Sequence, residues 1–126
     1  MGINKGDELM LPNRMQLNRQ TEEQLKRLKS YTGITPNIAA RLAFFRSVEN
    51  GFRYIHTNDK TKLDGSLVLD KITWLGETYQ ITEMVLRMLY PTYENKFLLK
   101  AWAAHVNDGI SSLRNFRSLN QLAQSL

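Results

Sequence analysis

The sequence of 126 residues contains no cysteine and only two histidines. The absence of cysteine excludes disulfide bonds, iron–sulfur ligation and a thiolate nucleophile, and it also excludes a carrier that holds sulfur as a persulfide. Without thiolates, two histidines cannot form a histidine-rich or thiolate metal site. The glycine-rich signatures G-x-x-x-x-G-K, G-x-G-x-x-G and G-x-S-x-G are missing as well. We therefore expect no catalytic residue, no metal and no cofactor, and a protein that is not an enzyme.

Long hydrophobic runs are also absent. No apolar stretch approaches the roughly 18 residues that a membrane span requires, and the opening MGINKGDEL is polar where a signal peptide would be apolar. These features predict a soluble, cytoplasmic protein that does not bind a membrane. Its apolar content of 42% and charged content of 23% are typical of a globular chain.

Acidic residues are scarce in the first half of the chain. Residues 1–62 contain 11 Lys and Arg against 6 Asp and Glu, a net charge of +5, whereas residues 63–126 contain 6 of each sign. A localised basic excess is the electrostatic footprint of a nucleic-acid-binding protein. A solvated basic face that only keeps the protein in solution would have the same composition, so the charge favours a polyanion ligand without establishing one.

The basic excess surrounds two predicted amphipathic helices. The first is expected to begin at Thr21, to bury Leu25 and Leu28, and to end at Gly33. The second is expected to be capped by Thr35, with a proline at its first position. Its apolar face is predicted from helical spacing to comprise Ile38, Ala39, Leu42, Ala43, Phe45 and Val48.

Eight side chains in this half are candidates for binding DNA. Lys26 and Arg27 also have a local explanation, because they lie four residues after Glu22 and Glu23; Lys29 has none. The start of the second helix is a potential anion site, although capping alone accounts for its residue types. The eight candidates are Arg14, Arg19, Lys26, Arg27, Lys29, Thr35, Asn37 and Arg41.

Residues before the first helix alternate in polarity. Met15 and Leu17 would lie on one face of an extended segment, and Arg14, Gln16 and Asn18 on the other. A short strand before two helices is the order found in ribbon-helix-helix DNA-binding proteins, whose strands read the major groove. The alternatives are the end of an irregular arm or an extension of the first helix.

The whole chain is predicted to be one mainly α domain. We expect a compact helical domain with a helix-turn-helix-like or ribbon-helix-helix-like N-terminal half and at most a short hairpin. Residues 1–13 would form an arm, 14–51 the basic strand and helix-helix unit, 52–76 a connector with a possible hairpin, and 77–126 the C-terminal helices.

The second half is predicted to supply a strand and further helices. Leu67 to Trp74 is expected to be a strand, and if it pairs with Phe52–His56 the two segments make a hairpin. Helices are expected at 78–90 and 93–107, the second stopped by Gly109. Their predicted buried residues are Ile81, Met84, Val85, Met88 and Leu89 in the first, and Phe97, Leu98, Ala101, Trp102 and His105 in the second.

Two adjacent phenylalanines indicate an oligomer. Phe44 and Phe45 point about 100° apart on a helix of 3.6 residues per turn. We expect one of them to pack inside the domain and the other to pack against a second subunit.

The run LKRLKSYTGITPNIAARLAF resembles the DndE family of DNA sulfur modification proteins. These small proteins belong to a bacterial system that replaces a non-bridging phosphate oxygen of DNA with sulfur. The resemblance implies a DndE-like domain over residues 1–126 and, as partners, the enzymes that mobilise sulfur and modify DNA. It depends on Leu25, Leu28, Lys29, Thr32, Gly33, Thr35, Pro36, Asn37, Arg41, Leu42, Ala43, Phe44 and Ser47, with weaker similarity at 75–77 and 105–109. These motifs are structural and basic, so they indicate a pathway more than a reaction.

Three functions are consistent with the sequence. The favoured one is a non-enzymatic accessory subunit of the DNA phosphorothioation system, a homo-oligomer that binds the backbone of double-stranded DNA through a basic surface. The alternative is a sequence-specific ribbon-helix-helix regulator, in which Arg14, Gln16 and Asn18 read bases. The third is a scaffold that binds only proteins and has no affinity for DNA.

Overall fold

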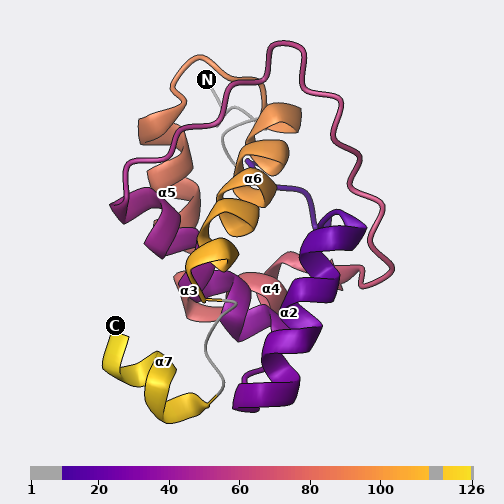
Figure 1. Ribbon diagram of the computed structural model, residues 1–126. Helices are drawn as coiled ribbons and strands as arrows, with labels where there is room; N and C mark the ends of the chain where they lie inside the picture. The colour runs from indigo at the N-terminus through magenta and orange to yellow at the C-terminus, as the bar shows by residue number, and fades with distance from the viewer. Residues whose placement is uncertain (1–9, 114–117, 126) are drawn as a thin grey trace.

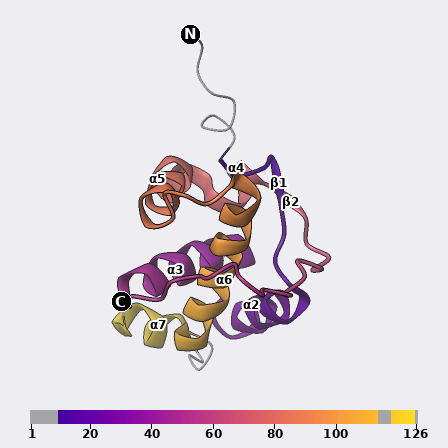
Figure 2. The same cartoon turned by 90° about the horizontal axis from the view of Figure 1, so that it is seen from above.

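The computed structural model describes residues 10–113 and 118–125. The fold is mainly helical, as the sequence predicts. Helix α6 runs through the middle of the molecule, with α2 and α3 beside one part of it and α5 beside another (Figures 1 and 2). The elements are β1 (Arg14–Met15), α2 (Arg19–Thr32), α3 (Pro36–Glu49), β2 (Leu69–Asp70), α4 (Lys71–Leu75), the 3-10 helix η1 (Gly76–Thr78), α5 (Tyr79–Leu89), α6 (Asn95–Leu113) and α7 (Leu119–Ser125).

Helix α2 begins two residues earlier than Thr21, because Asn18 is its N-cap. The Asn18 side-chain oxygen accepts a hydrogen bond from the Thr21 amide at 2.7 Å. The predicted stop is confirmed, since Gly33 has a φ of +80° and its amide donates to the Lys29 carbonyl at 2.8 Å. Helix α3 begins after Thr35 as predicted, but no side-chain hydrogen bond caps it.

The predicted apolar face of α3 is only partly the buried one. Ile38 is exposed, and Leu42 and Phe45 are half-buried. The side chains that α3 buries are mostly small: Ala39, Ala40, Ala43, Phe44 and Ser47. Small side chains let α3 approach α6 closely, so the periodicity of the large apolar residues identified a neighbouring face.

Gly109 makes this close approach possible and does not end α6. A Cβ at Gly109 would overlap with the backbone of Ala43 on α3, including its carbonyl oxygen. The helix continues for four residues beyond it, to Leu113. The predicted core of this helix is confirmed at Leu98, Ala101, Trp102 and His105, whereas Phe97 is half-buried.

Helix α5 exposes three of its five predicted core residues, whereas Val85 and Leu89 are half-buried against the core. Ile81, Met84 and Met88 were predicted to be buried but are 47%, 54% and 71% exposed. The helix turns Glu83 inward instead, where its carboxylate accepts hydrogen bonds from the Leu11 amide at 3.1 Å and from Lys71 at 3.0 Å. These partners satisfy a buried charge that sequence periodicity treats as an exposed one.

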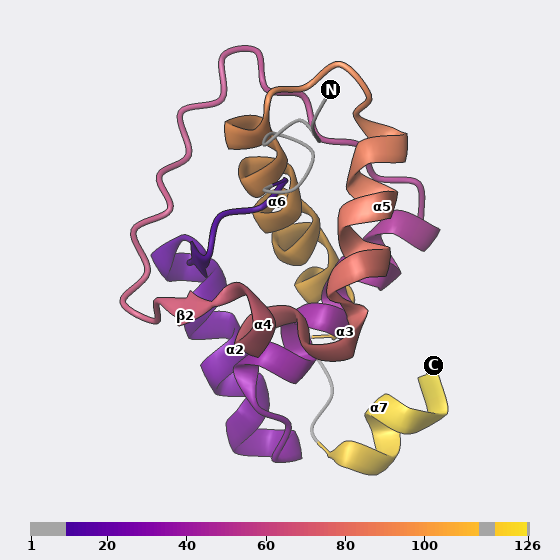
Figure 3. The ribbon, with the colours of Figure 1, turned by 180° about the vertical axis from the view of Figure 1, so that it is seen from behind.

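The second half of the strand predicted at 67–74 is a helix. Only β2 is extended, and it pairs antiparallel with β1, Arg14 opposite Asp70, rather than with 52–56. Residues 71–75 form α4, which places the Trp74 indole in the core, where its Nε1 donates to the Met15 carbonyl at 2.7 Å. Figure 3 shows β2 leading directly into α4, on the near side of α2 and α3 in that view.

Both ends of the described chain are attached to the domain. Leu11 of the predicted arm is buried, and Leu122 of α7 is buried as well. Arg46 donates to the Ser125 carbonyl at 3.3 Å, which connects α7 to α3. The part of the predicted arm at residues 1–9 lies outside the described residues. Within 10–113 and 118–125, no helix is long and apolar enough to cross a membrane.

Candidate nucleic-acid interface

The solvent face of α2 carries four of the predicted DNA-binding residues. Arg19 and Lys26 lie almost in line along the helix, and Arg27 and Lys29 lie to either side of that line. All four are exposed. Among the residues that the structure describes, the side chains of Arg19, Arg27 and Lys29 form no hydrogen bond or ion pair.

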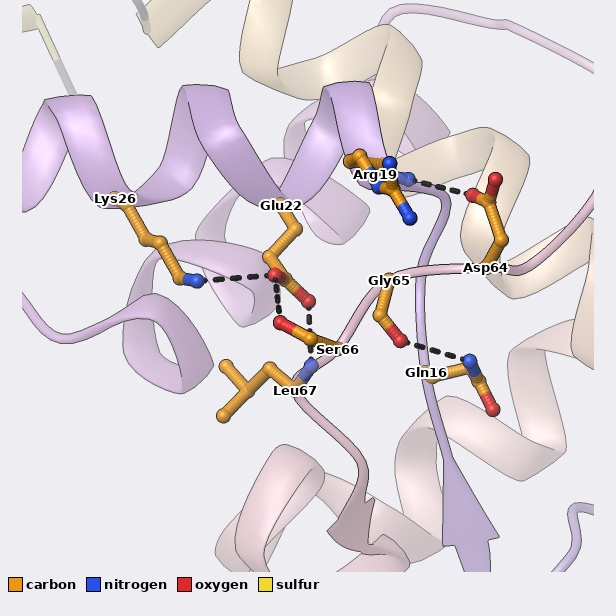
Figure 4. Close-up of polar contacts among 8 residues, drawn as sticks. All are labelled: Gln16, Arg19, Glu22, Lys26, Asp64, Gly65, Ser66 and Leu67. Carbon is orange, nitrogen blue, oxygen red and sulfur yellow. Dashed lines mark hydrogen bonds and ion pairs between the residues drawn. The ribbon is translucent and has the colours of Figure 1, made fainter.

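Glu22 is removed from this face because its carboxylate points inward (Figure 4). The Glu22 side chain is only 4% exposed. One of its oxygens accepts from the Leu67 amide at 2.7 Å, and the other accepts from the Ser66 hydroxyl at 2.9 Å and from Lys26 at 3.0 Å. Glu22 therefore fastens the connector to α2.

The surrounding donors keep Glu22 ionised. Burial raises the pKa of this carboxyl, but the hydrogen bonds from Leu67, Lys26 and Ser66 outweigh burial and lower the pKa below its ordinary value. The predicted pair with Lys26 is thus confirmed, while no ion pair joins Glu23 to Arg27 in the described part of the chain.

The connector fits closely against the start of α2. Gly65 donates its amide to the Leu17 carbonyl at 2.7 Å, and a Cβ at Gly65 would lie 2.6 Å from a Glu22 oxygen. Asp64 accepts from the Arg19 amide at 2.9 Å. These contacts fix where the N-terminal end of the basic face lies relative to the connector (Figure 4).

Arg14 is occupied by the strand pair. Its guanidinium donates to the Asp70 carboxylate and to the Val68 carbonyl, both at 3.3 Å. Both side chains of the ion pair are 65% exposed, so the pair contributes little to stability. Arg14 therefore lies apart from α2 and already has a partner of opposite charge.

The candidates at the start of α3 face α4. The Thr35 hydroxyl donates to Asn37, and the Asn37 amide donates to the Thr73 carbonyl at 3.0 Å. Arg41 donates to the Trp74 carbonyl at 2.8 Å and to the Thr73 carbonyl at 3.1 Å. Asn37 and Arg41 thus satisfy carbonyls of a short helix, while Thr35 holds the Asn37 side chain, and the structure does not bring these three residues into the α2 face.

The polar residues of the 14–18 segment are used inside the chain. Gln16 donates to the Gly65 carbonyl at 2.9 Å, and Asn18 caps α2. The strand itself has two residues and pairs with β2 of the same chain. These contacts weigh against a base-reading role for Gln16 and Asn18.

Ser47, His105 and Asp108 lie together, but not in the order of a hydrolytic triad. Ser47 donates to Asp108 at 2.7 Å, so its oxygen accepts from His105 Nδ1 at 2.9 Å. Nε2 of the ring then accepts from the Tyr90 hydroxyl at 2.7 Å. In a triad the histidine lies between serine and acid; here the serine does, and His105 is fully buried. The cluster joins α3, α6 and the end of α5.

Among the described residues, there is no cluster of three or more His, Cys, Asp or Glu side chains that would hold an ion.

Sequence reasoning missed the residues that shape this interface from inside. Glu22 was interpreted only as a partner of Lys26, and Asn18 as a base-reading candidate. A signal for Asn18 was available, because asparagine is among the preferred N-cap residues and stands directly before the first turn of α2. The bonds from Glu22 to Ser66 and Leu67 span more than 40 residues, and no local pattern reveals them.

Comparison with known proteins gives a consistent result. Residues 14–121 match the model of the family described as DNA sulphur modification protein DndE. A crystal structure of DndE from Escherichia coli B7A, described as involved in DNA phosphorothioation modification, is similar at 74% identity and a TM-score of 0.79, over 81% of this chain and 98% of that one. A DndE G21/24K mutant structure is similar at 73% identity and a TM-score of 0.77, over 82% and 98% of the two chains. The comparison with curated proteins finds no match.

Proposed function

Because the chain belongs to the DndE family of DNA sulfur modification proteins, we propose that it is a DNA-binding accessory subunit of the phosphorothioation machinery. In this proposal it carries out no chemical step, and it works in the cytoplasm beside the enzymes that mobilise sulfur and modify DNA. The absence of cysteine supports this division of labour, since the chain has no thiol on which sulfur could be carried.

The observation that carries the proposal is the charge of the α2 face. Three cationic side chains, Arg19, Arg27 and Lys29, are exposed and unpaired among the described residues, while Glu22 is turned inward. Only Glu23 opposes them on the same helix. Unpaired cations that project from a rigid helix, with Arg27 and Lys29 to either side of Arg19, can contact phosphates of a duplex backbone.

Binding of this kind positions the protein without reading sequence. Contacts to phosphate fix register and orientation, and base edges carry the sequence information. We therefore expect similar affinity for unrelated duplexes and a steep loss of affinity with salt.

We also propose that copies of the chain associate through apolar surface. The exposed residues of α5, Ile81, Met84 and Met88, would then be covered in the oligomer. A groove of about 470 Å³ along α3 offers a second apolar surface; it is lined by Ile38, Arg41, Leu42, Phe45, Arg46, Glu49 and Thr78. Phe44 is buried and Phe45 is half-buried in this groove, which agrees with the different roles predicted for the two rings.

Association is tested by the mass of the protein in solution. Met84→Glu places a charge on the exposed side of α5 without touching the domain core. Wild type is expected to be an oligomer by light scattering and the variant a smaller species, with Gln20→Glu at an exposed position of α2 as the control. A monomeric wild type contradicts this part of the proposal.

The sequence-specific regulator is disfavoured by the internal contacts of Gln16 and Asn18, and one binding experiment separates the two functions. Wild type, Lys29→Gln and Arg14→Gln are titrated by fluorescence anisotropy onto unrelated duplexes across a salt series. Lys96→Gln, an exposed lysine on α6, controls for the loss of one charge.

The backbone-binding subunit predicts similar affinities for every duplex and a shallower salt dependence only in Lys29→Gln. A strong preference for one duplex, lost in Arg14→Gln, supports the regulator. No binding at low salt contradicts both and leaves a scaffold that binds proteins.

A further inference from the structure

A cavity of about 360 Å³ lies between the connector and one face of α6. One part of its wall is apolar and comprises Phe52, Ile55, Leu63, Ala103 and Ala104. The other part is polar and includes Asn18, Arg53, Asp59, Lys100 and Asn107. The volume is at the lower end of the range for small-molecule sites.

The two asparagines are oriented by a single buried residue. The Thr21 amide donates to the Asn18 side-chain oxygen at 2.7 Å, and the Thr21 hydroxyl donates to the Asn107 side-chain oxygen at 2.8 Å. Both acceptor atoms are therefore taken. The NH₂ group of each asparagine has no partner among the described residues, so each asparagine offers the cavity a donor.

The one carboxylate among the residues that line the cavity, Asp59, already has hydrogen-bond donors within the chain. Asp59 accepts from the Tyr54 hydroxyl at 2.6 Å and from the Thr61 amide at 3.0 Å, and Lys100 lies 3.7 Å away. Burial raises the pKa of Asp59, but these donors outweigh burial and lower it. Asp59 is thus a fixed part of the wall with its own donors.

The free polar groups of the cavity are consequently donors. They comprise the amides of Asn18 and Asn107 and the guanidinium of Arg53, which also donates to its neighbouring carbonyl. A ligand that matches this wall has several acceptor atoms and negative charge at one end, and an apolar or planar body at the other.

We propose that this cavity binds a single nucleotide, with the phosphate on the Asn18, Arg53 and Asn107 donors and the base against the apolar wall. The same chemistry has two sources, a free nucleotide or an unpaired nucleotide swung out of DNA. Asn18 is also the N-cap of α2, so the cavity adjoins the N-terminal end of the basic face. Only the DNA source rests on the proposed function; binding of a free nucleotide does not.

The direct test follows the asparagine side chains by NMR while dAMP is added to the full chain. The NH₂ resonances of Asn18 and Asn107 are expected to shift and to saturate together. Deoxyadenosine, which lacks the phosphate, is expected to bind at least tenfold more weakly. Equal binding of the two ligands, or no saturable shift of either resonance, overturns the proposal.

The substitution Asn107→Asp tests the NH₂ donor of Asn107 separately from the structural role of this side chain. The substitution replaces the NH₂ by an acceptor and keeps an oxygen for the Thr21 hydroxyl, so the local structure is retained. We expect at least a tenfold loss of dAMP affinity, while Asn120→Asp on α7, which adds the same charge elsewhere, changes affinity less than twofold. Equal effects of the two substitutions contradict the assigned donor.

The source is identified with duplex DNA that is fully paired or carries one bulged nucleotide. Preference for the bulged duplex, lost in Asn107→Asp, assigns the cavity to DNA. Equal binding of both duplexes, with dAMP affinity intact, assigns it to a free nucleotide. If the protein binds dAMP but no duplex, the DNA-binding function is refuted and the cavity site is not. If it binds duplex DNA but no dAMP, the cavity site is refuted and the DNA-binding function is not.

Discussion

Protonation of His105 should destabilise this protein at mildly acidic pH. The ring is fully buried, and burial, with a smaller contribution from Arg53, lowers its pKa from 6.5 to about 4 although Asp108 opposes the shift. In the neutral form Nδ1 donates to Ser47 and Nε2 accepts from Tyr90. A second proton on Nε2 would require the Tyr90 hydroxyl, which already accepts from the Tyr54 amide at 2.7 Å, to accept from the ring as well and to turn its own proton elsewhere.

The sign and size follow from linkage. The unfolded chain takes up the proton near the ordinary pKa and the folded chain only near 4, so stability is present above about pH 6.5 and is lost as pH falls toward 4. Each pKa unit corresponds to about 1.4 kcal/mol. Between pH 7 and pH 5 we therefore expect the free energy of unfolding to fall by about 2 kcal/mol.

Urea unfolding at several pH values measures this loss in wild type, His105→Gln and His56→Gln. The His105→Gln protein is expected to be less stable throughout, but its stability should hardly change from pH 7 to pH 5, because glutamine does not titrate. His56→Gln, at the other histidine, should retain the wild-type dependence. A wild type whose stability is flat over this range refutes the reasoning.

Three further predictions concern packing and charge. Gly109→Ala pushes a Cβ into the α3 backbone and should lower the free energy of unfolding by about 1–3 kcal/mol in urea; Ser111→Ala on the same helix is the control, and a Gly109→Ala protein as stable as wild type would contradict the close helix crossing. Glu22→Gln places an amide NH₂ among three donors and should lower the free energy of unfolding by about 2–3 kcal/mol without weakening DNA binding. An unchanged melting temperature at neutral pH would contradict a stabilising role for the contacts of Glu22 with Ser66 and Leu67. Arg41→Gln should lower the melting temperature because two carbonyls of α4 lose their donor, yet leave the salt dependence of DNA binding as in wild type; a slope reduced as in Lys29→Gln would place Arg41 in the interface.

Except for α4, which was predicted as part of a strand, the positions of the main helices were predictable from the sequence, but the buried faces of α3 and α5 were not. The periodicity of Ile81, Met84 and Met88 identifies a helix correctly, yet the buried side of α5 is the one that contains Glu83. The carboxylate is acceptable inside because Leu11 supplies a donor from 72 residues away. Such a long-range partner leaves no periodic trace in the sequence.

In α3 the reason is packing. The contact of Gly109 with the Ala43 backbone brings two helices so close that small residues form the core face. Apolar periodicity gives weight to large residues and therefore selected Ile38, Leu42 and Phe45.

The candidate site also contains residues whose roles were predictable from the sequence and residues whose roles were not. The cations of α2 were recognisable from the sequence, because the position of Arg27 away from Leu25 and Leu28 on the same helix predicts its exposure. The roles of Asn37 and Arg41 were not, since both depend on carbonyls of α4 that lie more than 30 residues away. Charge and local helix geometry can be read from sequence, while the partner that occupies a charge cannot.

The central claim is that the solvent face of α2 holds DNA phosphates. The most direct test compares the slope of log Kd against log salt for duplex DNA in wild type, Arg27→Gln/Lys29→Gln and the control Arg14→Gln. Each lost phosphate contact should reduce the slope by about 0.9, so the double variant should lose about 1.8, and the Arg14→Gln slope should match wild type. A double variant that binds DNA with the wild-type affinity and slope would contradict the account.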